Sequence, residues 1–156
     1  MGAYYLAIDI GASSGRHILG HLEDRRMVLE EIHRFGNRQV RKNGHDCWDI
    51  DHLWQGILEG LEICGKLGKI PATVGIDTWA VDFVLLDQEG RLLGDAVAYR
   101  DSRTQGADRL VEQKISPTAL YARTGIQKQP FNTIYQLAAL QQEHPEQLQK
   151  ARSLLM

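Results

Sequence analysis

The sequence predicts an α/β fold in which a mixed β-sheet carries flanking helices. Three observations support this prediction: three consecutive strand-like segments open the chain, a strongly periodic helix follows, and another strand-like segment comes after the helix. At 156 residues the chain has material for one domain with a single core, so we expect no second full domain.

The opening segments have the composition of a β-meander. Residues 4–10 are apolar, with aromatic and β-branched side chains, and end at a cluster of small residues, as a buried strand before a tight loop does. Two more strands are predicted at residues 16–23 and 27–35, joined by a turn at residues 23–26. We therefore expect three sequential strands.

A helix is predicted from Asp51, after a polar, extended stretch at residues 39–49. Asp49 or Asp51 is the expected N-cap, and Gly65 or Gly68 the expected stop. The apolar residues fall on one helical stripe: Leu53, Trp54, Ile57, Leu58, Leu61 and Cys64.

Two glycines, Gly56 and Gly60, lie inside this helix, four residues apart. Each costs about 1 kcal/mol relative to alanine. Their presence indicates close packing against the sheet; the alternative is that both are tolerated surface glycines.

The rest of the chain combines short strands and short helices. In the helix that starts near Asn132 we expect one apolar face of Ile134, Leu137, Ala138 and Leu140. The last residues are apolar without a stop signal, so we expect the chain to be interrupted there. The other predicted elements are a strand at 73–77, a hairpin of strands 81–86 and 91–98 around a turn at 87–90, helices at 106–114 and 116–121, and a strand within 151–156.

Composition argues against several classes of protein. The chain has 18 basic and 20 acidic residues, a net charge of −2, and its basic residues are scattered, so neither nucleic acid nor a membrane surface is an expected partner. No apolar run is long enough to span a bilayer, and the start does not have the pattern of a secretory signal. We therefore expect a soluble, cytoplasmic protein.

The cysteines predict neither a disulfide nor a metal site. Cys47 and Cys64 form no Cys-x-x-Cys pair, and two reduced, half-buried thiols are the expected state in the cytoplasm. His45, Asp46 and Cys47 are metal-ligand types, but no second pair stands at a suitable spacing.

The most informative motif is residues 9–16, Asp-Ile-Gly-Ala-Ser-Ser-Gly-Arg. Small residues after a strand let backbone N–H groups and hydroxyls face a phosphate. Asp9, at the strand end, is placed to hold Mg²⁺, through water. A Walker loop and a dinucleotide fingerprint are excluded, because no Gly-Lys-Ser/Thr follows and the next element is a strand. A plain tight hairpin turn remains the alternative.

Two further polar motifs are candidate sites. In residues 75–83, Asp77 and Asp82 flank Trp79, which suits a sugar: carboxylates accept from hydroxyls while the indole covers an apolar face. The alternative is a core tryptophan with two turn carboxylates. Residues 99–103, Tyr-Arg-Asp-Ser-Arg, are either part of the same site or a solvated ion-pair loop.

Together these motifs resemble the FGGY family of carbohydrate kinases, which share the actin, Hsp70 and hexokinase (ribonuclease H-like) fold. The resemblance covers essentially the whole chain, which corresponds to the N-terminal part of the first kinase domain. A second, C-terminal domain is absent from residues 1–156. The matching segments are residues 9–16, 31–35, 48–49, 75–87, 98–103, 130–133 and 135–137.

The resemblance implies a phosphotransferase: ATP-dependent phosphorylation of L-rhamnulose at its 1-hydroxyl, in L-rhamnose degradation, by a protein expected to be monomeric at full length. It implies ATP and Mg²⁺ as cofactors, with the ketose and ATP as the small-molecule partners. It assigns the sugar contact to Ala80, with Trp79, Asp82 and Arg100 nearby. The implied ATP-phosphate loop consists of Ala12, Ser13, Ser14, Gly15 and Arg16.

The chain departs from the family pattern at three places. Ala80 stands where a glycine is usual, and Gln136 and Ala139 stand where the wider family has lysine and tryptophan. The general base, an aspartate in similar kinases, is expected downstream of this chain, so these residues alone are expected to be inert. The alternatives are a stand-alone sugar or phosphate-binding module, and a chaperone-type ATPase, against which the segments around Trp79 and Arg100 argue.

Overall fold

The computed structural model describes residues 2–156, which divide into two compact units. The first, here the sheet unit, contains the residues up to Arg38 together with Asp49–Trp79. The second, the helical unit, contains Gln39–Trp48 and Ala80–Met156. Each unit has buried apolar clusters of its own, so the single core expected from the chain length is replaced by separate ones.

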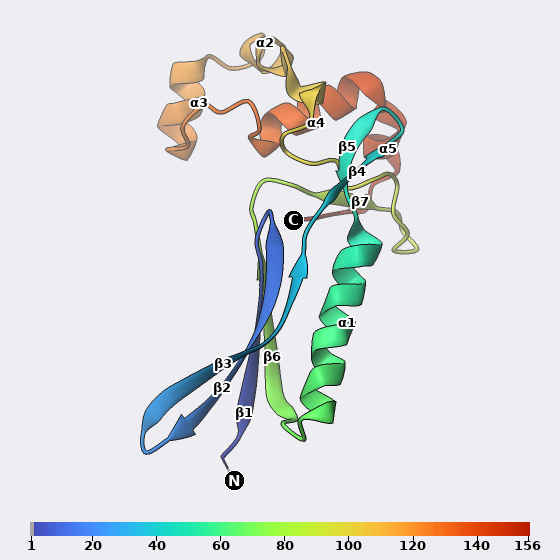
Figure 1. Ribbon diagram of the computed structural model, residues 1–156. Coiled ribbons are helices and arrows are strands. Elements are labelled where there is room, and N and C mark those ends of the chain that lie inside the picture. The colour runs from blue at the N-terminus through green and yellow to red at the C-terminus, as the bar shows by residue number, and fades with distance from the viewer. Residues whose placement is uncertain (1) are drawn as a thin grey trace. The chain divides into compact units, whose positions relative to one another are not determined.

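The sheet unit is built on four strands in the order β3-β2-β1-β6 (Figure 1). The predicted meander is confirmed, with β1 and β2 antiparallel and β2 and β3 antiparallel. The strand after the helix returns parallel to β1, which makes the sheet mixed. The bounds are β1 Tyr4–Ile10, β2 Ser14–Glu23, β3 Arg26–Gly36 and β6 Pro71–Thr78.

Helix α1 (Ile50–Lys66) packs on one face of this sheet (Figure 1). Of the two expected N-caps, Asp49 is the one used: its side chain accepts a hydrogen bond from the backbone N–H of His52. The buried stripe differs from the expected one, because Trp54 and Leu58 are exposed. The buried positions of α1 are Leu53, Gly56, Gly60 and Cys64.

The two helix glycines make room for large side chains from the sheet. A Cβ on Gly56 would lie 2.6 Å from the ring of Phe35, and one on Gly60 would lie 2.2 Å from the ring of His17. The close-packing interpretation is therefore confirmed, and the surface-glycine alternative is wrong.

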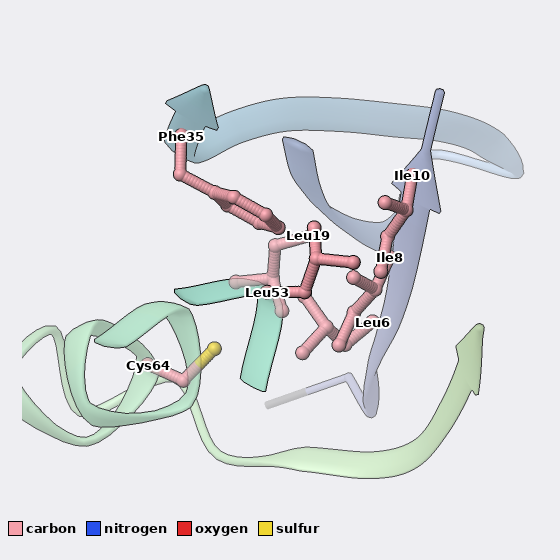
Figure 2. Packing of buried hydrophobic residues seen from close by; sticks show 7 residues of the cluster. All are labelled: Leu6, Ile8, Ile10, Leu19, Phe35, Leu53 and Cys64. Carbon is pink, nitrogen blue, oxygen red and sulfur yellow. The ribbon is translucent and has the colours of Figure 1, made fainter. Parts of the chain in front are cut away.

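The core of the sheet unit lies between the sheet and α1 (Figure 2). Alternate residues of β1 point to the helix, as the period of a strand requires. Burial of these side chains is the main favourable term in holding the helix to the sheet. The cluster consists of Leu6, Ile8, Ile10, Leu19, Phe35, Leu53 and Cys64.

Gly60→Ala is expected to destabilise the chain by about 1–3 kcal/mol, because the new methyl group overlaps the buried ring of His17. Gly65→Ala is the matched control in the same helix, since nothing lies within 4 Å of its Cβ position. Thermal denaturation followed by circular dichroism measures both. Equal melting temperatures for the two variants would contradict the packing described here.

His17 makes the stability of the sheet unit sensitive to acid. Burial lowers its pKa from 6.5, a hydrogen bond to the Ile57 carbonyl oxygen at 3.2 Å opposes this, and His33 adds to the lowering. Below about pH 6.5 the unfolded chain therefore binds a proton that the native His17 does not.

Urea denaturation should show stability that is constant above pH 6.5 and falls as the pH drops below it, toward the lowered pKa. His17→Leu removes the titrating group, so the fall between about pH 6.5 and pH 5.5 should be shallower in this variant. Parallel curves for the two proteins would argue against His17 as the cause.

The helical unit contains two small sheets and five short helical segments. Strands β4 (Gln39–Lys42) and β5 (His45–Trp48) form one hairpin, and β7 (Val84–Leu86) pairs with β8 (Ser153–Leu155). The strand expected near the last residue is thus present. The helical segments are η1 (Ser102–Thr104), α2 (Ala107–Glu112), α3 (Pro117–Thr124), α4 (Thr133–Glu143) and α5 (Pro145–Lys150).

The hairpin predicted from strands 81–86 and 91–98 is only partly formed. The turn closes as expected, with the N–H of Asp87 donating to Arg91 and that of Leu93 to Leu85. Beyond Leu93 the chain leaves β7 and bonds to β5 instead: the Trp48 N–H donates to Ala96, and the Ala98 N–H to Asp46. Residues 91–98 are therefore not a continuous strand.

Helix α4 begins after Asn132 as expected, and of its predicted apolar face Leu140 is buried while Leu137 and Ala138 are partly buried. Ile134 is 37% exposed, whereas the buried positions are Tyr135, Gln136, Ala139 and Leu140. Both cysteines are free, and they are fully buried rather than half-buried as expected. No helix among the described residues is long and apolar enough to cross a membrane.

Candidate functional site

The predicted phosphate loop is the turn that joins β1 to β2. The N–H of Gly11 donates to Ser14 across it, at 2.9 Å, and Ala12 and Ser13 are exposed. Asn37 holds the turn from outside: its N–H donates to the Ser13 carbonyl, and its side-chain Nδ2 donates to the Gly11 carbonyl, both at 3.0 Å. The turn is thus held in shape by a residue that the motif does not contain.

Gly15 in this loop is required by packing. A Cβ on it would lie 2.2 Å from the ring of Phe35, the same ring that covers Gly56. Because Phe35 is buried between the sheet and α1, it has no free space into which to move. The glycine therefore allows the turn after β1 to continue directly into the core strand β2.

Asp9, the predicted metal residue, is paired with Arg16 across β1 and β2. Arg16 Nε and Nη2 lie 2.8 and 2.7 Å from Asp9 Oδ2, and both side chains are nearly half exposed. Asp77, on the parallel strand β6, is the register partner of Asp9, so the two acids share one face of the sheet, opposite α1. One cation and two acids thus stand side by side on three strands.

This set fits a magnesium ion of the kind that nucleotides carry. Mg²⁺ usually takes one or two carboxylates and completes its shell with water and phosphate oxygens. Asp9 keeps 45% of its side chain exposed, so its carboxylate is accessible to a hydrated ion of this kind. No cluster of three or more His, Cys, Asp or Glu able to hold a metal occurs within residues 2–156.

The loop with the predicted sugar contact, residues 80–82, has a strained backbone. Val81 has φ 72°, in the left-handed region, which costs a β-branched residue about 1–3 kcal/mol. Its carbonyl oxygen accepts from Thr133 Oγ1 at 2.8 Å and from Gln136 Nε2 at 3.1 Å. Ala80, just before it, is exposed. Strain of this kind concentrates at functional sites.

Asp82 is buried in a polar network within the helical unit. Its Oδ2 accepts from Trp48 Nε1 at 2.6 Å and from the Tyr99 N–H at 3.2 Å, while Oδ1 accepts from Gln136 Nε2 at 3.1 Å. Only 9% of the residue is exposed. The carboxylate therefore joins β5, the 80–82 loop and α4 to one another.

The other two predicted sugar residues have different surroundings. Arg100 is exposed, and its guanidinium lies over the ring of Tyr99, 5.3 Å from the ring centroid. Trp79 is half-buried and packs against the core cluster of the sheet unit. Arg100 thus has the freedom to meet a ligand, while part of the indole of Trp79 is used in packing.

The Tyr99–Arg103 segment is not a solvated loop throughout. Asp101 is 4% exposed and accepts from the Asp46 N–H, the His45 Nδ1 and the Arg103 N–H. Burial alone would raise the pKa of Asp101, but these hydrogen bonds outweigh it and lower the pKa. Asp101 therefore fixes the base of the segment, and Arg100 projects from it.

Sequence reasoning missed the residues that hold both loops. The family resemblance covers Trp48 and Gln136, but the sequence gives neither of them, nor Asn37, a role in holding a loop. A polar residue inside an apolar helical pattern was the one available signal for Gln136. Nothing local marks Asn37.

Comparison with known proteins identifies the family. The family model described as the FGGY family of carbohydrate kinases, N-terminal domain, matches residues 4–156. A protein named rhamnulokinase from Halalkalibacterium halodurans is 53% identical over 153 residues, 98% of this chain and 32% of that protein. The rhamnulokinase of Bacillus subtilis is 50% identical over 152 residues, 97% of this chain and 31% of that protein. The chain thus spans about a third of the length of these relatives.

Solved structures agree on the fold. The gluconate kinase of Lactobacillus acidophilus matches with a TM-score of 0.82 at 16% identity, covering 99% of this chain and 31% of that one. A xylulose kinase from the same organism matches with a TM-score of 0.77 at 16% identity, covering 97% and 31%. The predicted actin/hexokinase-like class, a mixed sheet with flanking helices, is confirmed. The chain belongs to the FGGY family of carbohydrate kinases and corresponds to its N-terminal domain.

Proposed function

We propose that this chain is the N-terminal part of a longer, ATP-dependent kinase that converts L-rhamnulose to L-rhamnulose 1-phosphate. The observation that carries the proposal is identity of about 50%, over nearly the whole chain, to proteins named rhamnulokinase. The exposed small-residue turn between β1 and β2 supports phosphate binding, since its N–H groups and hydroxyls are of the type that phosphates bind.

Each candidate residue has a proposed role. The loop of Ala12, Ser13, Ser14, Gly15 and Arg16 binds the ATP phosphates. Asp9 holds Mg²⁺ through water, and that ion spreads the charge of the transferred phosphoryl group. Ala80 contacts the sugar, with Trp79, Asp82 and Arg100 near it. The base that accepts the proton of the attacking hydroxyl belongs to a later segment of the protein.

The function is tested by purifying the full-length protein and supplying ATP, Mg²⁺ and one ketose at a time. L-Rhamnulose should have the highest kcat/KM, with one ADP released for each sugar phosphorylated at the 1-position. A higher kcat/KM for D-xylulose or another ketose would move the proposal to a different sugar. Gel filtration and cell fractionation of the same protein test the proposed monomeric state and cytoplasmic location.

A stand-alone sugar-binding module is the competing function, and the coding DNA distinguishes the two. A reading frame that continues past Met156 into an aspartate-bearing segment supports the kinase. A stop codon there supports the module. The 156-residue chain alone should form no sugar phosphate above a blank, and product from it would overturn the division of roles given above.

Ala80 carries a methyl group that the usual glycine lacks, and the sugar KM measures whether this group is neutral or trims the pocket. In the full-length enzyme Ala80→Leu should raise the KM for L-rhamnulose about tenfold or more, because the longer side chain occupies the place of the sugar, while the KM for ATP changes little. Ala80→Gly, the matched control, should stay within about threefold of wild type for both substrates. Insensitivity of the sugar KM to Ala80→Leu would remove Ala80 from the pocket.

A further inference from the structure

We propose that Gln136 is a positioning residue for the sugar: its side-chain amide holds the 80–82 loop in the arrangement that binds the ketose. The inference rests on the proposed function, in which Ala80 is the sugar contact. Gln136 lies in the first turn of α4, and the residue is 0% exposed. A buried amide has to form its hydrogen bonds within the protein, so the partners of Gln136 show what its side chain holds in place.

The amide of Gln136 reaches the loop from inside. Its Nε2 lies 3.1 Å from the carbonyl oxygen of Val81, 3.1 Å from Asp82 Oδ1 and 3.0 Å from the carbonyl oxygen of Phe131. Its Oε1 accepts from Arg103 Nη2 at 2.8 Å. The nitrogen thus faces three acceptors and the oxygen faces a donor, which determines the orientation of the amide.

Only an amide satisfies both sides of this site. A lysine would donate to the loop but would accept nothing from Arg103 and would place two cations together. A glutamate would accept from Arg103 but would turn a second carboxylate oxygen toward Asp82 and the two carbonyls. A methionine would fill the space and form none of these bonds.

The loop needs such support because of its backbone. Val81 has φ 72°, and its carbonyl is held by Gln136 and by Thr133, both from the first turn of α4. Without these bonds the Val81 peptide is free to rotate out of the left-handed region. Ala80, the preceding residue in the chain, would then change its backbone direction, so a bound ketose would lose alignment.

Gln136→Met in the full-length enzyme should raise the KM for L-rhamnulose about tenfold or more and leave the KM for ATP within about twofold. Gln142→Met is the matched control, since Gln142 is exposed on the same helix, and both its KM values should equal those of wild type. An unchanged sugar KM in Gln136→Met would overturn the proposal. Equal rises in both KM values would overturn it too, because they indicate general loosening.

Gln136→Glu adds a second measurement, the pH dependence of the sugar KM, which would not differ from that of Gln136→Met if Gln136 had only a structural role. When its carboxyl is protonated, the O–H replaces the N–H donor to the loop; when it is ionised, the donor is lost. The sugar KM of Gln136→Glu should therefore fall toward the wild-type value as the pH is lowered through the range in which the introduced carboxyl binds its proton, while that of Gln136→Met stays high. Parallel pH profiles for the two variants would contradict the inference.

Thr133→Val is a milder change that removes one of the two side-chain donors to the Val81 carbonyl. It should raise the sugar KM about threefold, and no rise would count against the inference. Failure of the inference and failure of the function are distinguishable. A wild-type enzyme inactive on L-rhamnulose refutes the function, whereas an active one whose sugar KM is insensitive to Gln136 and Thr133 refutes the inference alone.

Discussion

Asp9→Asn in the full-length kinase is expected to lower turnover at least tenfold at saturating ATP and ketose. The substitution keeps the size of the side chain but removes the negative charge that is proposed to hold Mg²⁺ at the end of β1. A tenfold loss corresponds to about 1.4 kcal/mol of transition-state stabilisation. Initial rates measured over a range of Mg²⁺ concentrations should also show a higher requirement for the metal.

Arg16 provides the control, because Asp9 has a second role as its ion-pair partner. If Asp9 serves the metal, Asp9→Asn should still cost about tenfold in an Arg16→Gln background. If it serves only to hold Arg16, the double variant should be no slower than Arg16→Gln alone. That second result would remove Asp9 from the metal site.

The parts of the fold that were predicted correctly are those whose signals are local. The meander was predictable because strand-like segments 4–10, 16–23 and 27–35 follow one another, and sequential strands of this kind usually pair. Helix α1 was visible from its period and from Asp49, whose N-cap contact involves a residue three positions away.

The errors come from pairing and packing over long sequence separations. Residues 91–98 alternate as a strand does, but Ala96 and Ala98 find their hydrogen-bond partners in β5, about fifty residues away. In α1, apolar Trp54 is exposed while Gly56 and Gly60 are buried, because Phe35 and His17 fill the space above the glycines. The hydrophobicity of single residues does not show that a small residue on the helix packs against a large one on the sheet.

In the candidate site, too, local features are visible in the sequence and contacts between distant residues are not. The turn between β1 and β2 is visible in the sequence because its small residues are contiguous, but Asn37, which holds the turn, comes two strands later in the chain. Asp82 is one of the predicted sugar residues, and its hydrogen-bond partners Trp48 and Gln136 are 34 and 54 residues away in the sequence. A single sequence has no local pattern that connects them.

Asp82→Ala is expected to cost the most stability of the changes considered. It leaves the Trp48 indole N–H and the Tyr99 backbone N–H, both now bonded to Oδ2, without their acceptor. At about 1–3 kcal/mol for each buried donor, the free energy of unfolding should fall by about 2–6 kcal/mol. Urea denaturation of the chain, followed by tryptophan fluorescence, measures this loss.

Two further variants show whether the loss of stability comes from the buried hydrogen bonds or only from the removal of a charge. Asp51→Ala removes an exposed carboxylate from the first turn of α1 and should change stability by only about 0.3–1 kcal/mol, so it controls for the loss of charge. Asp82→Asn keeps one oxygen for the Trp48 and Tyr99 donors but turns its NH₂ group toward the amide of Gln136, and should lie between the two. If Asp82→Ala is as stable as Asp51→Ala, the hydrogen bonds of Asp82 contribute little to the free energy of unfolding. The inference that Gln136 acts through this loop would then lose its physical basis.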